Sequence, residues 1–384
     1  MITSKIHSAL LLCILFSAVL LLPCWAWTAE GTVPISNHGK KWRIGYLQGG
    51  EKEEEYADSL KAFVAGLAEL GWLPQDAVPN VQKGQNNTAV IWKQLSENTE
   101  SKHLEFVSDA YWSGNWDKTL RKENQEKVIK RLNTAKDIDL MIAMGTWAGM
   151  DMANDLHSTN TIVIDASNPV ESQISASPEY SGRSYIHATV EQDRYKDQFD
   201  IFHQAVQFKR LGIVYKNSPE GKAFAALEAV RAAARQLHFT LVERSIPPEK
   251  NDRETVQMVA KYYEELAPNV DAVYMTSHLG VQPEDMPMLL RPLLEHKVPT
   301  WSQAGGWEVE QGALLGFDRP DYADLGFFQA KVMAQIFHGK APGKISQIFD
   351  NPKSEPVCLN LKTARLIEFN PDWKLLAAAE HIYE

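Results

Sequence analysis

Short apolar runs alternate with amphipathic runs along most of this chain, and this alternation limits the fold more than any other feature of the sequence. Four apolar runs have the length of strands: RIGYL (43–47), LEFVSD (104–109), DLMIAM (139–144) and TIVIDA (161–166). Segments with helical spacing lie between them, at 56–72 and 124–137. Short strands separated by helices predict right-handed βαβ units and a parallel sheet.

The same order begins again at Arg210. The strand-like runs are RLGIVY (210–215), FTLVER (239–244), DAVYMT (271–276) and PTWSQ (299–303), with a helix predicted over 223–237. The intervening residues 167–200 are rich in Ser, Pro and Gly and are predicted to cross between two lobes. A helix at 322–339 and a strand near 356–361 follow, and we expect them to return to the first lobe and then cross back.

We therefore predict an α/β protein with two doubly wound parallel-sheet lobes. The predicted first lobe comprises residues 42–188 plus 317–340, and the second comprises residues 189–316 plus 345–384.

The first 26 residues are predicted to be a signal peptide. Lys5 precedes an apolar stretch over 9–22, Pro23 ends it, and Cys24-Trp25-Ala26 offers small residues for cleavage. An uncleaved anchor is one alternative, and a lipoprotein is another because Leu21-Leu22-Pro23-Cys24 resembles a lipobox. Export predicts a periplasmic protein. Cleavage would leave Cys358 as the only cysteine, so no disulfide forms within the mature chain.

Composition and motifs exclude several functions. The formal net charge of −10, with no basic cluster, disfavours a nucleic-acid partner. The sequence contains no HExxH, CxxC, GxSxG, Walker or GxGxxG motif, and its histidines lack the spacing of metal ligands. The sequence thus predicts a binding protein rather than an enzyme, without cofactor or metal.

The loops that follow the predicted strands are the candidate binding site, because ligands of open α/β sheets bind outside the carboxyl ends of the strands. The candidates are Gln48, Thr146, Trp147, Ser167, Asn168, Asn217, Thr276, Ser277, Ser302 and Gln303. Their hydroxyl and amide groups beside helix N-termini suit a small polar or zwitterionic ligand held by neutral donors. Helix capping is the alternative role for each.

Aromatic residues lie near the same loops. Trp116, Trp147, Trp301 and Trp307 could stack on an aromatic ring or a methylated ammonium group, or simply pack in the cleft. His278 also follows a predicted strand.

Several phrases in order resemble one family. They include DLMIAMGTWA, TIVIDASNPVES, RLGIVYKNSPEGKAFAALEAVRAAARQL, VPTWSQAGG and QGALLGFDRPDYADLGFFQAKVMAQIFHGKAPG. Together they are similar to the substrate-binding proteins of ABC transporters, in the branch with tryptophan- and tyrosine-binding members and a type I periplasmic-binding fold. The resemblance covers Trp42 to Phe369.

The resemblance implies two lobes joined by a three-segment hinge that close over one ligand. It also implies a membrane permease with its ATPase as partner, and we expect the binding protein to be a monomer. Asp318 matches an acid common in the family. The chain departs from the family pattern at Asn168 and at Ser302-Gln303-Ala304-Gly305, where members usually carry acids, so the resemblance leaves the ligand open.

Three alternatives remain at this point. The first is an extracytoplasmic sensor for a histidine kinase or chemoreceptor, and the second is a secreted α/β enzyme. A transcriptional regulator with the same pair of lobes is disfavoured by the signal peptide and by the lack of N-terminal DNA-binding helices.

Overall fold

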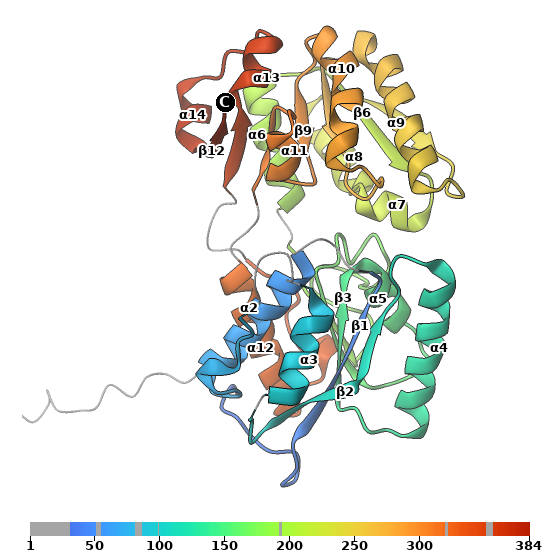
Figure 1. The fold of residues 1–384 in the computed structure, drawn as a ribbon, viewed down its shortest axis with the longest axis vertical. Helices are drawn as coiled ribbons and strands as arrows, with labels where there is room; N and C mark the ends of the chain where they lie inside the picture. Colours follow the sequence, from blue (N-terminus) through green and yellow to red (C-terminus); the bar gives the residue numbers. More distant parts are fainter. Residues whose placement is uncertain are drawn as a thin grey trace, which may run out of the picture.

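The computed structural model describes residues 31–50, 55–80, 87–98, 100–191, 194–318, 322–350 and 356–384; the predicted signal peptide lies outside these residues. Figure 1 shows two α/β lobes, one above the other. One is built on a five-stranded sheet and the other on a seven-stranded sheet. The predicted fold class, two lobes with largely parallel sheets, is confirmed.

The first lobe is a fully parallel sheet in the order β2-β1-β3-β4-β5. Its strands are β1 (Trp42–Gln48), β2 (Leu104–Ser113), β3 (Leu140–Met144), β4 (Asn160–Ile164) and β5 (Ile186–Ala188). Its helices are α2 (Glu55–Glu69), α3 (Thr88–Asn98), α4 (Lys118–Thr134), α5 (Gly145–Met152) and α12 (Tyr322–Phe337), with short 3-10 turns η2 (Gln75–Ala77) and η5 (Pro342–Lys344).

Burial on both faces explains why these strands are apolar throughout. Every residue of β3 is buried. One face of the sheet packs with α2, α3 and α12, and the other face packs with α4 and α5. A strand covered by helices on both sides has no solvent face, so it reads as a continuous apolar run rather than an alternating one.

The second lobe repeats this order as β7-β6-β8-β9-β10 and adds two edge strands. Its strands are β6 (Arg210–Lys216), β7 (Thr240–Ile246), β8 (Ala272–Met275), β9 (Thr300–Ser302), β10 (Leu315–Phe317), β11 (Val357–Asn360) and β12 (Ala379–Tyr383). Its helices are α6 (Arg194–Val206), α7 (Pro219–Phe224), α8 (Leu227–Leu237), α9 (Asp252–Leu266), α10 (Met286–Glu295), α11 (Gly306–Glu310), α13 (Leu361–Leu366) and α14 (Trp373–Ala378), with turns η3 (Ala267–Asn269) and η4 (Pro283–Asp285). The pairing of β10 with β11 is antiparallel.

The chain passes between the lobes after β5, after β10 and again before β11 (Figure 1). The predicted crossing at 167–200 is too broad. Residues 186–188 form the edge strand of the first sheet, and α6 of the second lobe already begins at Arg194. Much of the Ser- and Pro-rich segment is the loop between β4 and β5 within the first lobe. Its composition gave no signal for β5 or for the start of α6.

The helix predicted over 223–237 is also wrong in one respect, because the structure divides it. α7 ends at Phe224, and α8 begins at Leu227 after Ala226, whose φ of 48° is left-handed. Alanine-rich sequence favours a continuous helix, so the break is imposed by tertiary structure.

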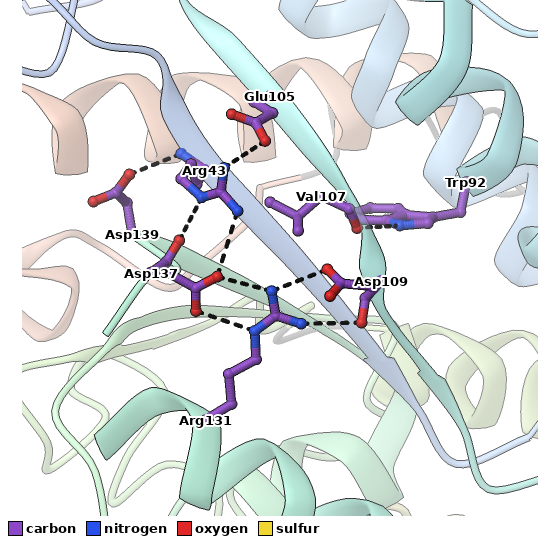
Figure 2. A network of polar contacts seen from close by, with 8 residues as sticks. All are labelled: Arg43, Trp92, Glu105, Val107, Asp109, Arg131, Asp137 and Asp139. Carbon is purple, nitrogen blue, oxygen red and sulfur yellow. Dashed lines mark hydrogen bonds and ion pairs between the residues drawn. The ribbon is translucent and has the colours of Figure 1, made fainter. Parts of the chain in front are cut away.

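An ion-pair network connects neighbouring strands of the first sheet at the end that lies away from the second lobe (Figure 2). Arg43 of β1 pairs with Glu105 of β2 and with Asp137, which precedes β3. Arg131 of α4 pairs with Asp137 at 2.8 Å and with Asp109 at 3.0 Å. Hydrogen bonds from Arg131 hold the pKa of Asp137 below its ordinary value. The network is structural, since it joins β1, β2, the loop before β3 and helix α4.

Within the part of the chain that the structure describes, we find no helix with the length and apolarity needed to cross a membrane.

Candidate functional site

A cavity of about 820 Å³ lies between the two lobes. Residues from both lobes line it, and most belong to loops at the carboxyl ends of strands. The first lobe contributes the loops after β2, β3 and β4, and the second contributes those after β6, β7, β8, β9 and β10. The carboxyl ends of the strands in both sheets therefore face this cavity. Open α/β folds bind ligands at this edge of the sheet.

The structure brings part of the predicted set together in this cavity. The predicted residues that line it are Trp147, Ser167, Thr276, Ser277, Ser302 and Gln303. Thr276 and Ser302 are almost fully buried, and their hydroxyl groups are engaged: Thr276 donates to the carbonyl of Val214, and Ser302 donates to the carboxylate of Glu308 at 2.6 Å. Ser277 and Gln303 remain partly exposed.

The other predicted residues do not line the cavity. Gln48 is buried and accepts hydrogen bonds from Tyr46 and Thr88. Thr146 lies one layer behind, where its hydroxyl accepts a hydrogen bond from the backbone N–H of Ser167 at 3.0 Å. Asn168 bonds to Glu171. Asn217 donates its backbone N–H to Ile246.

A chain of aromatic rings spans the cavity from one lobe to the other. Trp147 packs edge-on against Trp116 at 5.3 Å in the first lobe. Trp116 then meets His278 of the second lobe at 6.2 Å, and His278 stacks on Phe224 at 4.1 Å. Four rings in contact form an apolar wall that belongs to neither lobe alone.

Two of these ring residues and one acid of the cavity lining have strained backbone conformations. Trp116, Asp165 and His278 all line the cavity with φ values of 58°, 55° and 62°. A left-handed conformation is uncommon for residues other than glycine and tends to occur where function holds a side chain in place. Of these, Asp165 was missed at the sequence level because it continues the apolar strand run; an acid at a strand end was the available signal.

Charged groups also line the cavity, so neutral donors are not the only polar groups that a ligand could meet there. Asp165, Glu191 and Asp318 contribute carboxylates, and Arg194 contributes a guanidinium that pairs with Glu191 at 3.6 Å. A carboxylate oxygen of Asp318 also lies 3.0 Å from Nε2 of His381 in β12.

Arg121 of α4 fixes the position of Trp147. Its guanidinium lies 4.6 Å from the centre of the Trp147 ring and forms a bidentate pair with Asp151 of α5 at 2.7–2.9 Å. It also reaches Glu220 of the second lobe at 3.8 Å. Burial raises the pKa of Asp151 even though the hydrogen bonds and charge of Arg121 oppose the shift.

A second polar contact between lobes comes from Tyr195, a residue within the predicted crossing over 167–200. Its hydroxyl donates to the carbonyl of Ser167 at 2.7 Å and lies near the side chain of Gln303. Gln303 in turn accepts from the N–H of Ser277 and donates to the carbonyl of Phe224. Tyr195 thus links the strand-end loops of both lobes. Burial raises its pKa to about 12, so the hydroxyl stays protonated and remains a donor.

Replacing Tyr195 with phenylalanine should loosen this link with little effect on packing. The carbonyl of Ser167 would lose its donor, and we expect the free energy of unfolding to fall by about 1 kcal/mol. Denaturant unfolding measures the change. Replacing Tyr180 with phenylalanine is the control, because that ring is exposed and lies outside the cavity. Equal losses in both variants would argue against the link.

Two lobes of this topology, with a polar and aromatic cavity between their strand ends, define a solute-binding protein of the type I periplasmic-binding fold. The family model described as "ABC transporter substrate binding protein" matches residues 113–382, so the chain belongs to that family. The family consists of proteins that bind small molecules for transporters outside the cytoplasm. Among curated protein sequences, none matches this chain significantly.

Solved structures share the fold. A conserved domain protein from Vibrio cholerae is 16% identical, with a TM-score of 0.63, covering 89% of this chain and 100% of its own. An ABC domain from Streptococcus pneumoniae in complex with L-Trp is 16% identical, with a TM-score of 0.60, over 88% and 99% of the two chains. A substrate-binding protein with adhesive properties from Clostridium difficile is 19% identical, with a TM-score of 0.56, over 89% and 98%. At these identities the similarity concerns the fold.

Proposed function

We propose that this protein is the periplasmic solute receptor of an ABC importer and that it has no catalytic activity. The interlobe cavity carries the proposal, because residues of both lobes line it and a hinge motion would open or enclose it. A solute that contacts both lobes shifts the equilibrium toward the closed form by its additional contacts there. The closed form would then dock on a membrane permease with its ATPase.

We include in this proposal the signal peptide over 1–26, a monomeric state and the predicted division into two lobes. The mobile unit around β1–β5 would contain residues 42–188 plus 317–340, and the other would contain 189–316 plus 345–384. The placement of α12 on the first sheet and of β11 in the second supports this division.

The lining favours a small solute with an ammonium group and a flat apolar part. Trp116, Trp147 and His278 offer ring surfaces, and Asp165 and Asp318 offer carboxylates. An aromatic amino acid or a related amine fits these groups, and the structural neighbour from S. pneumoniae holds L-Trp. Ser277 and Gln303, with Ser167, are the proposed polar contacts.

A thermal-shift screen of the exported protein tests this function. The panel contains amino acids, small peptides, nucleosides, polyamines and quaternary amines, applied after refolding to remove any bound solute. A compound at 100 times its dissociation constant stabilises the folded state by roughly 2.7 kcal/mol, enough to raise Tm by several degrees. We expect an amine-containing aromatic compound to raise Tm. If no compound changes Tm, the receptor function is wrong.

Replacing Trp147 with alanine should weaken binding of the active compound about tenfold or more, since the ring and its edge-on partner are lost from the wall. The matched control is Trp373→Ala, because Trp373 is 74% exposed and does not line the cavity. Calorimetric titration gives both dissociation constants. Equal affinity in the two variants would contradict the proposed site.

A further inference from the structure

The lining of the interlobe cavity carries a large net negative charge. Among the residues that the structure describes, those that line the cavity include nine carboxylates and four lysine or arginine side chains, which gives a formal net charge of −5. The carboxylates come from both sheets. Asp165 directly follows β4 of the first sheet, and Asp318 directly follows β10 of the second. The negative charge is therefore a property of the whole cavity rather than of one of its edges.

Most cations of this lining are paired with acids. Arg194 lies 3.6 Å from Glu191, and Lys216 and Lys250 lie 3.8 Å and 3.0 Å from acids of helix α9. The carboxylate of an entering solute would have to compete with these acids for each of the three cations. It would also meet the negative charge that remains on the rest of the lining.

The aromatic wall of the cavity suits the opposite charge. The face of an indole ring attracts a cation through its quadrupole, and Trp147 shows this attraction, since the guanidinium of Arg121 lies 4.6 Å from its ring centre. That guanidinium brings no net positive charge to the site, because it forms a bidentate pair with the carboxylate of Asp151. Rings and carboxylates together can therefore bind a flat solute that carries an ammonium group.

We propose that the cavity selects aromatic amines of net positive charge over the corresponding zwitterionic amino acids, with Asp165 and Asp318 as the carboxylates nearest the ammonium group. The inference rests on the proposed receptor function and narrows its solute class. A zwitterion brings its own carboxylate into the same negative surroundings, and this repulsion offsets the attraction that its ammonium group gains.

The expected selectivity is large because the charges interact inside a cleft. Charges separated by a few ångströms in a protein interact strongly enough for one repulsive pair to change an equilibrium constant tenfold or more. Salt screens such pairs less when they are buried than when they are exposed. We therefore expect the cationic form of a solute to bind at least about tenfold more tightly than its zwitterionic form.

Four indole compounds that differ in charge test the inference. Tryptamine and L-tryptophanamide are cations at about pH 7, L-tryptophan is a zwitterion and indole-3-propionate is an anion. The decisive pair is L-tryptophanamide and L-tryptophan, because the two differ only in the replacement of the carboxylate by a neutral amide. Calorimetric titration gives the dissociation constants. We expect both cations to bind at least about tenfold more tightly than L-tryptophan, and the anion to bind most weakly.

The variant Asp165→Asn removes one negative charge without changing the shape of the side chain. Asparagine tolerates the left-handed backbone of this residue, whose φ is 55°, as well as aspartate does, so the loop should keep its conformation. The affinity of L-tryptophanamide relative to L-tryptophan should fall about fivefold or more. Asp318→Asn removes a charge at the end of the second sheet and should act in the same direction.

The ratio of the two affinities separates charge from structural damage. A variant that only loosens the cavity weakens the binding of both compounds and leaves their ratio unchanged. The matched control is Asp155→Asn, because the side chain of Asp155 is 97% exposed and does not line the cavity. This control should keep the ratio of the unsubstituted protein.

The inference is wrong, while the receptor function stands, if L-tryptophan binds as tightly as L-tryptophanamide or if both cavity variants keep the normal ratio. It is also wrong if none of the four indoles binds but another compound of the thermal-shift panel does. If no compound of either set binds, the receptor function itself is wrong. The two failures are therefore distinguishable.

Discussion

Gly326→Val is expected to destabilise the first lobe by about 3 kcal/mol or more, because helices α12 and α2 touch backbone to backbone at this residue. A Cβ atom on Gly326 would overlap the backbone carbonyl of Ala62 and lie 2.7 Å from the backbone nitrogen of Phe63. Gly66 faces it from α2, where an added Cβ would lie 2.8 Å from the carbonyl oxygen of Gly326. Neither helix can retreat without opening the core around Phe63 and Met333.

Denaturant unfolding of Gly326→Val gives the change in free energy directly. The control is Ala323→Leu, which adds a larger side chain at an exposed position of the same helix and should change stability by less than about 0.5 kcal/mol. A valine variant as stable as this control would show that the helices are not held at the distance the structure gives.

The position of α12 also bears on the hinge. The helix follows β10 of the second lobe yet packs on the first sheet, so one crossing ends at its N-terminus. We expect the unfolding transition of Gly326→Val to broaden or split, because loosening α12 weakens the first lobe while leaving the core of the second intact. Circular dichroism combined with tryptophan fluorescence would show two transitions.

The fold was predictable because short apolar runs alternate with amphipathic runs in the sequence of each lobe. Buried strands such as β3 and β6 are apolar along most of their length. The same strand order occurs in both lobes. Elements whose pattern is weaker were missed. Helix α6 lay within the predicted crossing, and β12 is an edge strand with three exposed central residues, so it has no apolar run.

The candidate site was only partly predictable, for a physical reason. A strand-end position places a residue at the correct edge of the sheet, but it does not determine whether the side chain points into the cavity or back to the protein. Thr146 and Gln303 have the same kind of position, yet Thr146 supports the loop of Ser167 while Gln303 lines the cavity. Tyr195 comes from a helix that begins at a crossing, and its contact with Ser167 depends on how the lobes meet.

The second large effect is expected for Arg121→Ala, which removes the partner of a buried carboxylate. The side chains of Arg121 and Asp151 are 16% and 9% exposed, and breaking such a pair from one side costs about 3 kcal/mol because the remaining charge is left without compensation. Trp147 would lose the guanidinium over its ring as well. Solute affinity should therefore fall together with stability.

The pH dependence of this loss has a definite sign. Burial already raises the pKa of Asp151 above its ordinary value, and removing Arg121 takes away the groups that oppose the rise. The variant then folds best with Asp151 protonated, so its destabilisation should be smaller at pH 5 than at pH 8. Urea unfolding at both pH values measures this, with Lys122→Ala, an exposed neighbour on α4, as the control.

A double variant separates the charge from the packing. Arg121→Met with Asp151→Leu removes both charges and fills similar volumes, so it should be more stable than Arg121→Ala at pH 8, by roughly 1–2 kcal/mol. Its affinity for the active solute should nevertheless stay reduced, because the contact of Arg121 with Glu220 across the lobes is also absent. Full recovery of affinity in the double variant would mean that Arg121 acts on the cavity only by stabilising the first lobe.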